Sequence, residues 1–151
     1  MANYGRSPHI AIALLFVTLV FSSWAIAAAG EDETAKATRQ TLEGGIAAFN
    51  KEDLDTTLKT LHSNSPNYKV SKERISRIFH DHDVAMELVE FDYVGETEPY
   101  AIARAKVKST KKSDTKFKNN TTESLYIFKK QDNQWKLWGE YELQTVFDDK
   151  Q

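Results

Sequence analysis

The sequence predicts an α+β domain in which three N-terminal helices pack on one face of a curved, four-stranded antiparallel sheet. Apolar residues recur at helical spacing in the first half of the chain, as at Leu42, Ile46 and Phe49. Two aromatic-rich runs between Ser124 and Phe147 flank a short polar turn and read as a β-hairpin. Helices that come first and strands that come last indicate two segregated layers rather than alternating α/β units.

The first helix is expected from Glu31 to about Asn50. Its apolar stripe is interrupted by Gly44-Gly45, and each glycine in a helix interior costs about 1 kcal/mol relative to alanine. We therefore expect another element to lie close against this pair.

Two shorter helices follow. Asp53 is a suitable N-cap for the second, whose Leu54, Leu58 and Leu61 share one side. After a short strand or bend at Tyr68 to Val70, Ser71 offers an N-cap for the third. Its apolar side consists of Ile75, Ile78 and Phe79.

The rest of the chain is predicted to be strand. Val84 to Gly95 forms the first strand, and Tyr100 to Lys112 forms a second with clear alternation. The inward residues of the second strand are Ala101, Ala103, Ala105 and Val107. Their small size implies that a helix comes close, and the Gly44-Gly45 helix is the expected partner.

The closing hairpin turns at Asp132-Asn133, residues that tolerate a left-handed backbone. Strict alternation in its second strand places Glu140 and Glu142 on the outer face. A β-bulge near Gly139 would invert this assignment downstream. The residues predicted to face inward are Trp135, Leu137, Gly139, Tyr141, Leu143, Thr145 and Phe147.

Residues 1–29 have the three parts of a secretory signal peptide: a polar lead with Arg6, the apolar run Ile10–Val20 and the small residues Ala25–Ala29. Cleavage would leave a single domain, residues 30–151. An uncleaved membrane anchor over Ile10–Ala29 is the alternative. We expect export to the periplasm or the medium, and the absence of cysteine favours a bacterial envelope over a disulfide-rich secreted setting.

Composition narrows the range of partners. The formal net charge of −2 gives no general attraction to nucleic acid, and the absence of cysteine excludes disulfides, thiolate metal sites and a cysteine nucleophile. The lysines between Lys106 and Lys118 lack arginines and interleaved aromatics, which favours a solvated loop. Contact with anionic lipid or polysaccharide is the alternative for them.

Two segments carry a resemblance to a known family. They are Ala47-Ala48-Phe49-Asn50 before Glu52-Asp53-Leu54, and Tyr126-Ile127-Phe128-Lys129-Lys130 followed by Trp135-Lys136-Leu137. Over about Glu31 to Asp148 the chain resembles the nuclear transport factor 2-like superfamily, including its SnoaL-like branch. The resemblance implies a cone-like, cystatin-like roll around a pocket closed by helices, and pairing through the outer sheet face. Because members include isomerases, dehydratases, polyketide cyclases and exported proteins of unknown role, it implies no single activity.

The predicted pocket is apolar with a few hydroxyls, and no catalytic acid of the superfamily carries over to this sequence. We therefore expect an exported, non-catalytic domain, without cofactor, that binds a small apolar molecule or an envelope protein. It is expected to pair as a homodimer through Tyr100, Ile102 and Trp138. The candidate pocket residues are His62, Tyr68, Trp135, Tyr141 and Thr145.

The alternative function is a small lyase or isomerase, similar to ketosteroid isomerases or polyketide cyclases, acting on a hydrophobic substrate. It would use His62, Tyr68 or Tyr141 as proton donor and an inward Glu87 or Asp92 as partner.

Two further motifs have simple explanations. In His80-Asp81-His82-Asp83 the alternating histidines are weak candidates for a metal site, but no complementary ligand stands out elsewhere. Histidine and aspartate suit a helix end and turn, so we expect no metal. Asn119 to Thr122 contains two overlapping glycosylation sequons, which matter only in a eukaryotic host.

Overall fold

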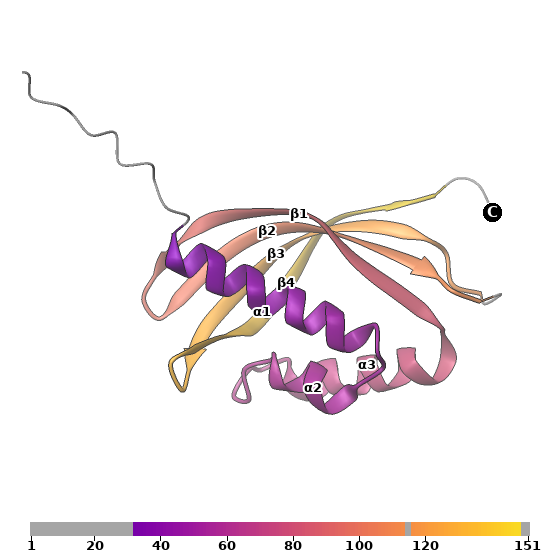
Figure 1. Cartoon of the computed structure of the whole chain (residues 1–151), viewed down its shortest axis with the longest axis horizontal. Helices are drawn as coiled ribbons and strands as arrows, with labels where there is room; N and C mark the ends of the chain where they lie inside the picture. Colours follow the sequence, from indigo (N-terminus) through magenta and orange to yellow (C-terminus); the bar gives the residue numbers. More distant parts are fainter. Residues whose placement is uncertain (1–31, 114–115, 149–151) are drawn as a thin grey trace, which may run out of the picture.

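The computed structural model describes residues 32–113 and 116–148, so the predicted signal peptide lies outside the described residues. The elements are α1 (Glu33–Phe49), α2 (Leu54–Lys59), α3 (Tyr68–Asp81), β1 (Val84–Thr97), β2 (Tyr100–Lys111), β3 (Asn120–Gln131) and β4 (Gln134–Phe147). The strands form one antiparallel sheet in the order β1-β2-β3-β4. α1 crosses one face of this twisted sheet, and α2 and α3 lie beside it (Figure 1). The predicted α+β fold class is confirmed.

The first helix is capped at its start and buried along its predicted apolar stripe. The Asp32 carboxylate accepts a hydrogen bond from the Thr34 amide at 2.8 Å, which fixes the start of α1. Leu42 and Phe49 are buried against the sheet and the other helices. The Thr41 hydroxyl donates to the carbonyl oxygen of Trp135 at 2.8 Å and ties α1 to β4.

One glycine of the pair in α1 lies close against another element, as expected. A Cβ atom on Gly45 would lie 3.0 Å from the hydroxyl of Thr60, whereas one on Gly44 would meet nothing within 4 Å. The close approach of the glycine is therefore to the residue that follows α2. The helix that contains the pair packs on the alanine strand as expected, since Leu42 shares a core cluster with Ala101 and Ala103. In β2, Ala101, Ala103 and Ala105 are buried on the inner face as predicted.

The second helix follows prediction, and the third starts earlier. The Asp53 carboxylate caps α2 by accepting from the Thr56 amide at 2.9 Å. α3 begins at Tyr68 rather than at Ser71, because the turn after Pro66 leads directly into helix through the bond from the Tyr68 amide to the Ser65 carbonyl. The expectation of a strand or bend at Tyr68 to Val70 was wrong.

The β3–β4 turn is the predicted one. Asp132 has φ of 51° and Asn133 has φ of 60°, the left-handed backbone that a two-residue hairpin connection requires.

β4 contains two bulges, which change which side chains face the helices. Ile127 pairs with Gly139 but Phe128 pairs with Leu137, so Trp138 is an extra residue in the ladder. In the same way, Glu123 pairs with Gln144 but Ser124 pairs with Glu142, so Leu143 is a second extra residue.

Between the bulges the predicted faces are reversed. Glu140 and Glu142 pair with Tyr126 and Ser124, which are buried on the inner face, so the prediction that both glutamates point outward was wrong. Gly139 and Tyr141 pair with outer-face residues, and Tyr141 is 57% exposed. Beyond the second bulge the original alternation returns: Thr145 pairs with Thr122 and Phe147 with Asn120.

The first bulge coincides with a contact from the end of α2. The His62 amide donates to the Leu137 carbonyl and the Leu137 amide donates to the Thr60 carbonyl, both at 2.9 Å. The Ser65 hydroxyl donates to the Trp138 carbonyl at 2.6 Å. This segment therefore pairs with the outer edge of β4 at the point where the ladder shifts register.

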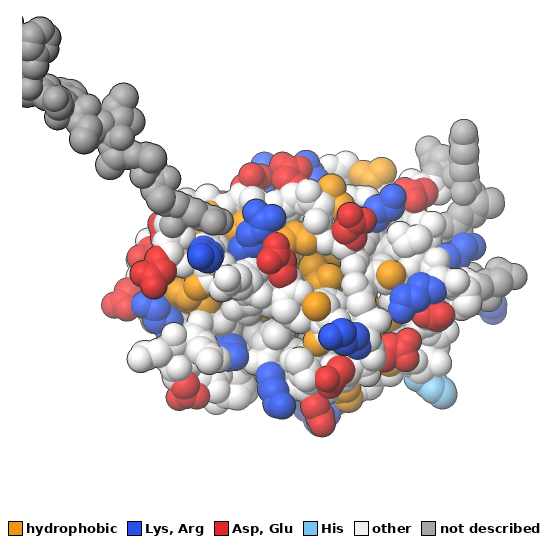
Figure 2. Space-filling view, viewed as in Figure 1, with side chains coloured by type: hydrophobic (Ala, Val, Ile, Leu, Met, Phe, Trp, Pro, Cys, Tyr) orange, Lys and Arg blue, Asp and Glu red, His pale blue; other side chains and the backbone are white. Residues whose placement is uncertain are grey.

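The surface carries mixed charge. Lysine, arginine, aspartate and glutamate side chains are interspersed over the face that shows α1 (Figure 2). Among residues 32–113 and 116–148, no helix is both long enough and apolar enough to cross a bilayer.

Candidate ligand-binding site

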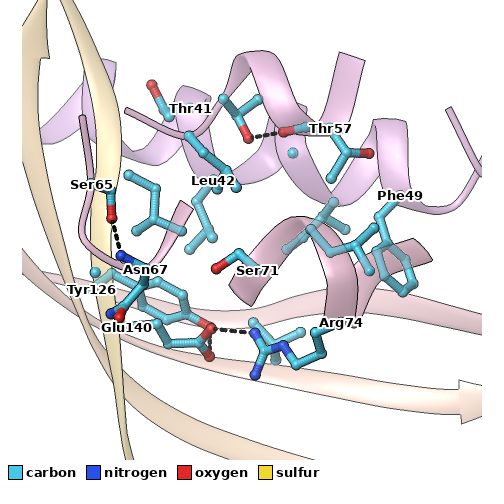
Figure 3. A pocket seen from close by; sticks show the side chains of 18 of the residues that line it. Thr41, Leu42, Phe49, Thr57, Ser65, Asn67, Ser71, Arg74, Tyr126 and Glu140 are labelled. Carbon is cyan, nitrogen blue, oxygen red and sulfur yellow. Dashed lines mark hydrogen bonds and ion pairs between the residues drawn. The ribbon is translucent and has the colours of Figure 1, made fainter. Parts of the chain in front are cut away.

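A cavity of about 450 Å³ lies between the helices and the inner face of the sheet (Figure 3). This volume is in the range of small-molecule pockets, about 300–1,000 Å³. Apolar side chains from the helices and from all four strands make up much of its wall. They include Leu42, Ile46, Phe49, Leu61, Ile75, Ile78, Met86, Val107, Phe128 and Leu137.

One side of the cavity carries a cluster of polar groups centred on Glu140. One carboxylate oxygen, Oε1, accepts hydrogen bonds from the Tyr126 and Ser124 hydroxyls, each at 3.2 Å. The other oxygen, Oε2, lies 3.4 Å from a guanidinium nitrogen of Arg74 (Figure 3). β3, β4 and α3 thus each contribute to the cluster.

The two sides of Glu140 differ in exposure. Tyr126 and Ser124 are buried, whereas the Arg74 side chain is 65% exposed. The Glu140 side chain itself is 30% exposed. Glu140 therefore accepts from buried hydroxyls on one side and meets a solvent-exposed cation on the other.

Tyr126 acts as a donor in this cluster. Burial, and then the negative charge of Glu140 and the hydrogen bond to it, hold the pKa of the Tyr126 phenol well above its usual range. The hydroxyl therefore stays protonated at physiological pH and cannot serve there as a base.

A second carboxylate lines the same wall. Glu142 faces inward between the bulges, and its Oε1 accepts from the Thr145 hydroxyl at 2.7 Å. Thr145 is in turn 3.0 Å from the hydroxyl of Thr122, which also lines the cavity.

The structure separates the five predicted pocket residues. Tyr68 lines the cavity. His62 is buried outside the cavity lining, where its Nδ1 accepts from the Asn64 amide at 3.1 Å and its ring meets the edge of Trp138. Trp135 belongs to the buried core rather than to this cavity.

Tyr141 and Thr145 lie outside the cavity lining for different reasons. Tyr141 is on the outer face because of the Trp138 bulge, whereas Thr145 stands behind Glu142 and bonds to it. Sequence reasoning missed Glu140 because of the same bulge. The spacing of Ser124, Tyr126 and Phe128 at every second residue places them on one face of a strand, and this is the sequence signal that could have found the hydroxyls of the cluster.

The carboxylates considered for the enzyme alternative do not reach the cavity, although one of its candidate donors, Tyr68, lines it. Glu87 pairs with Lys108 and Asp92 with Arg104, on the outer side of the β1–β2 pair. Neither lines the cavity. In the described part of the chain, no group of at least three His, Cys, Asp and Glu residues is placed to hold a metal ion. The ring of His82 instead packs near Phe117, with centroids 5.9 Å apart.

The predicted dimer residues are partly brought together. The rings of Tyr100 and Trp138 meet edge to face with centroids 6.1 Å apart. The Lys129 ammonium lies 4.2 Å from the centre of the Trp138 ring. Ile102 is 36% exposed on the outer face of β2, while Trp138 also borders the cavity.

Comparison with known proteins identifies one family and one fold. Residues 40–147 match the family described as the anti-sigma-I factor RsgI9, C-terminal domain. No curated protein matches the chain.

Several solved structures are similar in fold. A nuclear transport factor 2-like protein of unknown function from Shewanella oneidensis is 14% identical with a TM-score of 0.56, covering 72% of this chain and 98% of its own. A cystatin-like protein of unknown function from Nostoc punctiforme is 12% identical with a TM-score of 0.59, covering 76% and 90%. A Novosphingobium aromaticivorans protein provisionally named a scytalone dehydratase is 12% identical with a TM-score of 0.61, covering 78% and 89%. These likenesses show a nuclear transport factor 2-like fold, and at such identities they show the fold alone.

Proposed function

This chain belongs to the family of the C-terminal domain of the anti-sigma-I factor RsgI9, and from that premise we propose that it is a non-catalytic domain that binds a small, largely apolar molecule. The observation that supports this proposal is the cavity of about 450 Å³ beneath the helices, with its mainly apolar wall. The family takes its name from a domain of a regulatory protein, and ligand binding without turnover suits such a role.

The polar groups of the cavity favour binding over proton transfer. A general base needs a free lone pair directed at the substrate. Oε1 of Glu140 already accepts two hydrogen bonds, and Oε2 faces Arg74. His62 does not line the cavity. The cluster therefore suits recognition of a polar end of the ligand.

The experiment is a binding assay with N-phenyl-1-naphthylamine, an uncharged probe that fluoresces in apolar surroundings. We expect it to bind the folded chain, and Ile46→Trp, which fills the cavity, to weaken binding at least tenfold. Val89→Phe is the matched control, because Val89 is 55% exposed and lies outside the cavity lining. Absence of probe binding, or equal effects of the two substitutions, would contradict the proposal.

A second function is favoured by one observation. The Tyr126 hydroxyl lies 3.2 Å from a Glu140 carboxylate oxygen within the cavity lining, and a donor and a carboxylate are what a small lyase or isomerase requires. In that case Tyr126 donates a proton and Glu140 accepts one after Arg74 moves away. Turnover of a hydrophobic ketone or alcohol that is abolished by Glu140→Gln would favour this function.

Export and pairing are part of the proposal. Export followed by cleavage near residue 29 predicts a mature protein without residues 1–29, which mass spectrometry of the exported protein would reveal. Pairing of two copies through Tyr100, Ile102 and Trp138 predicts the mass of a dimer in light scattering. Ile102→Lys should shift it to the monomer, because it places a charge in the apolar contact.

A further inference from the structure

The charges on the cavity wall do not balance. Its lining contains one arginine, Arg74, and two glutamates, Glu140 and Glu142, and no lysine, histidine or aspartate. With all three ionised, the wall carries one negative charge in excess. Glu140 is half-buried and Glu142 is exposed, so the excess negative charge attracts a cation most strongly beside Glu140, where solvent screens it less.

The one cation present is loosely held. Arg74 reaches Glu140 at 3.4 Å with a side chain that is 65% exposed, and a solvent-exposed ion pair of this kind contributes little to stability. It comes from α3, in which Ile75 is the one residue buried. A ligand cation can therefore take the place of the guanidinium at little cost.

The carboxylates are held in position for such an exchange. The Tyr126 and Ser124 hydroxyls both bind Oε1 of Glu140, which orients the group and leaves Oε2 toward Arg74 and the solvent side. Glu142 follows two residues later on the same face of β4, about 7 Å along the strand. A positively charged group between them meets both carboxylates.

We infer that the ligand is an amphiphilic amine, whose ammonium group displaces Arg74 and lies between Glu140 and Glu142 while its apolar body fills the cavity beneath α1. This inference rests on the proposed function and names the chemical class of its ligand. The apolar wall formed by Leu42, Ile46 and Phe49 surrounds the body. The carboxylates select the charged end over a neutral or anionic one.

The test compares three compounds with one alkyl chain and different head groups: n-octylamine, n-octanol and octanoate. Each is titrated calorimetrically into the folded chain at pH 7. We expect the amine to bind at least tenfold more tightly than the alcohol and the carboxylate. Glu140→Gln and Glu142→Gln, which keep the side-chain shape, should each weaken amine binding severalfold and weaken octanol binding much less.

Arg74→Met provides the opposite change, because it removes the competing cation and should strengthen amine binding. Equal affinity for the three head groups, or tightest binding of octanoate that Arg74→Met abolishes, would overturn the inference while the cavity remained a binding site. If neither N-phenyl-1-naphthylamine nor any of the three alkyl compounds binds, the proposed function itself fails. Circular dichroism of each variant verifies that it is folded.

Discussion

Replacing Tyr126 with phenylalanine removes one buried hydroxyl from the sheet and tests the Glu140 cluster directly. A hydrogen bond to a charged group contributes about 1.5–3 kcal/mol when it is well buried. Glu140 is 30% exposed and keeps Ser124 and Arg74 as partners, so we expect the lower end of that range, a loss of about 1.5 kcal/mol at pH 7.

The difference should reverse in alkali. Burial beside Glu140 raises the pKa of Tyr126 in the folded chain, whereas in the unfolded chain the phenol ionises near pH 10. The folded state therefore binds the proton more tightly, and the stability due to this group is complete below pH 10 and is lost as the pH rises. The loss approaches 1.4 kcal/mol per pH unit and reaches about 1.4 kcal/mol at pH 11. The stability curves of wild type and Tyr126→Phe should cross near pH 11.

Urea denaturation followed by circular dichroism, at pH 7, 9, 10 and 11, measures both free energies of unfolding. Groups that titrate alike in the two proteins, such as Lys106, cancel in the difference. Tyr141→Phe controls for loss of an exposed phenol and should change stability at pH 7 by less than about 0.5 kcal/mol. A difference between wild type and Tyr126→Phe that stays constant from pH 7 to pH 11 would refute the burial of Tyr126 beside Glu140.

Two further predictions concern α1. Asn50→Ala should reduce the free energy of unfolding, measured in urea, by about 2 kcal/mol. The Asn50 side-chain amide makes two hydrogen bonds to the backbone of Met86, at 2.7 and 2.8 Å, and each contributes about 1 kcal/mol. A loss under about 0.5 kcal/mol would argue against this link to β1. Gly44→Ala should stabilise the chain by up to about 1 kcal/mol, since its Cβ meets open space, whereas Gly45→Ala should gain less because its Cβ meets Thr60 at 3.0 Å. Equal gains at the two glycines would contradict the close contact between α1 and Thr60.

Local patterns were enough to predict the fold but not the charged wall of its cavity. The alternation at Ala101 and Ala103 and the left-handed turn at Asp132-Asn133 depend on neighbouring residues, so the sequence carries them directly. The bulge at Trp138 coincides with pairing by the segment after α2, which is distant in the sequence.

The bulge at Trp138 also explains why the predicted pocket residues differ from the observed ones. Strict alternation assigned Tyr141 to the pocket and Glu140 to the solvent, and the bulge exchanges them. The contact of Arg74 with Glu140 joins α3 to β4, which are far apart in the sequence, so no sequence spacing predicts it.

The two supernumerary residues of β4 also define where this strand tolerates a change in length. Trp138 and Leu143 have no partner of their own in the pairing with β3, so deleting either one would leave every other side chain of the strand on its present side. Adding or removing a single residue anywhere between them would instead turn part of the strand over. Length variation confined to these two points would therefore preserve the acidic lining of the cavity, even in homologues whose strands differ in residue count.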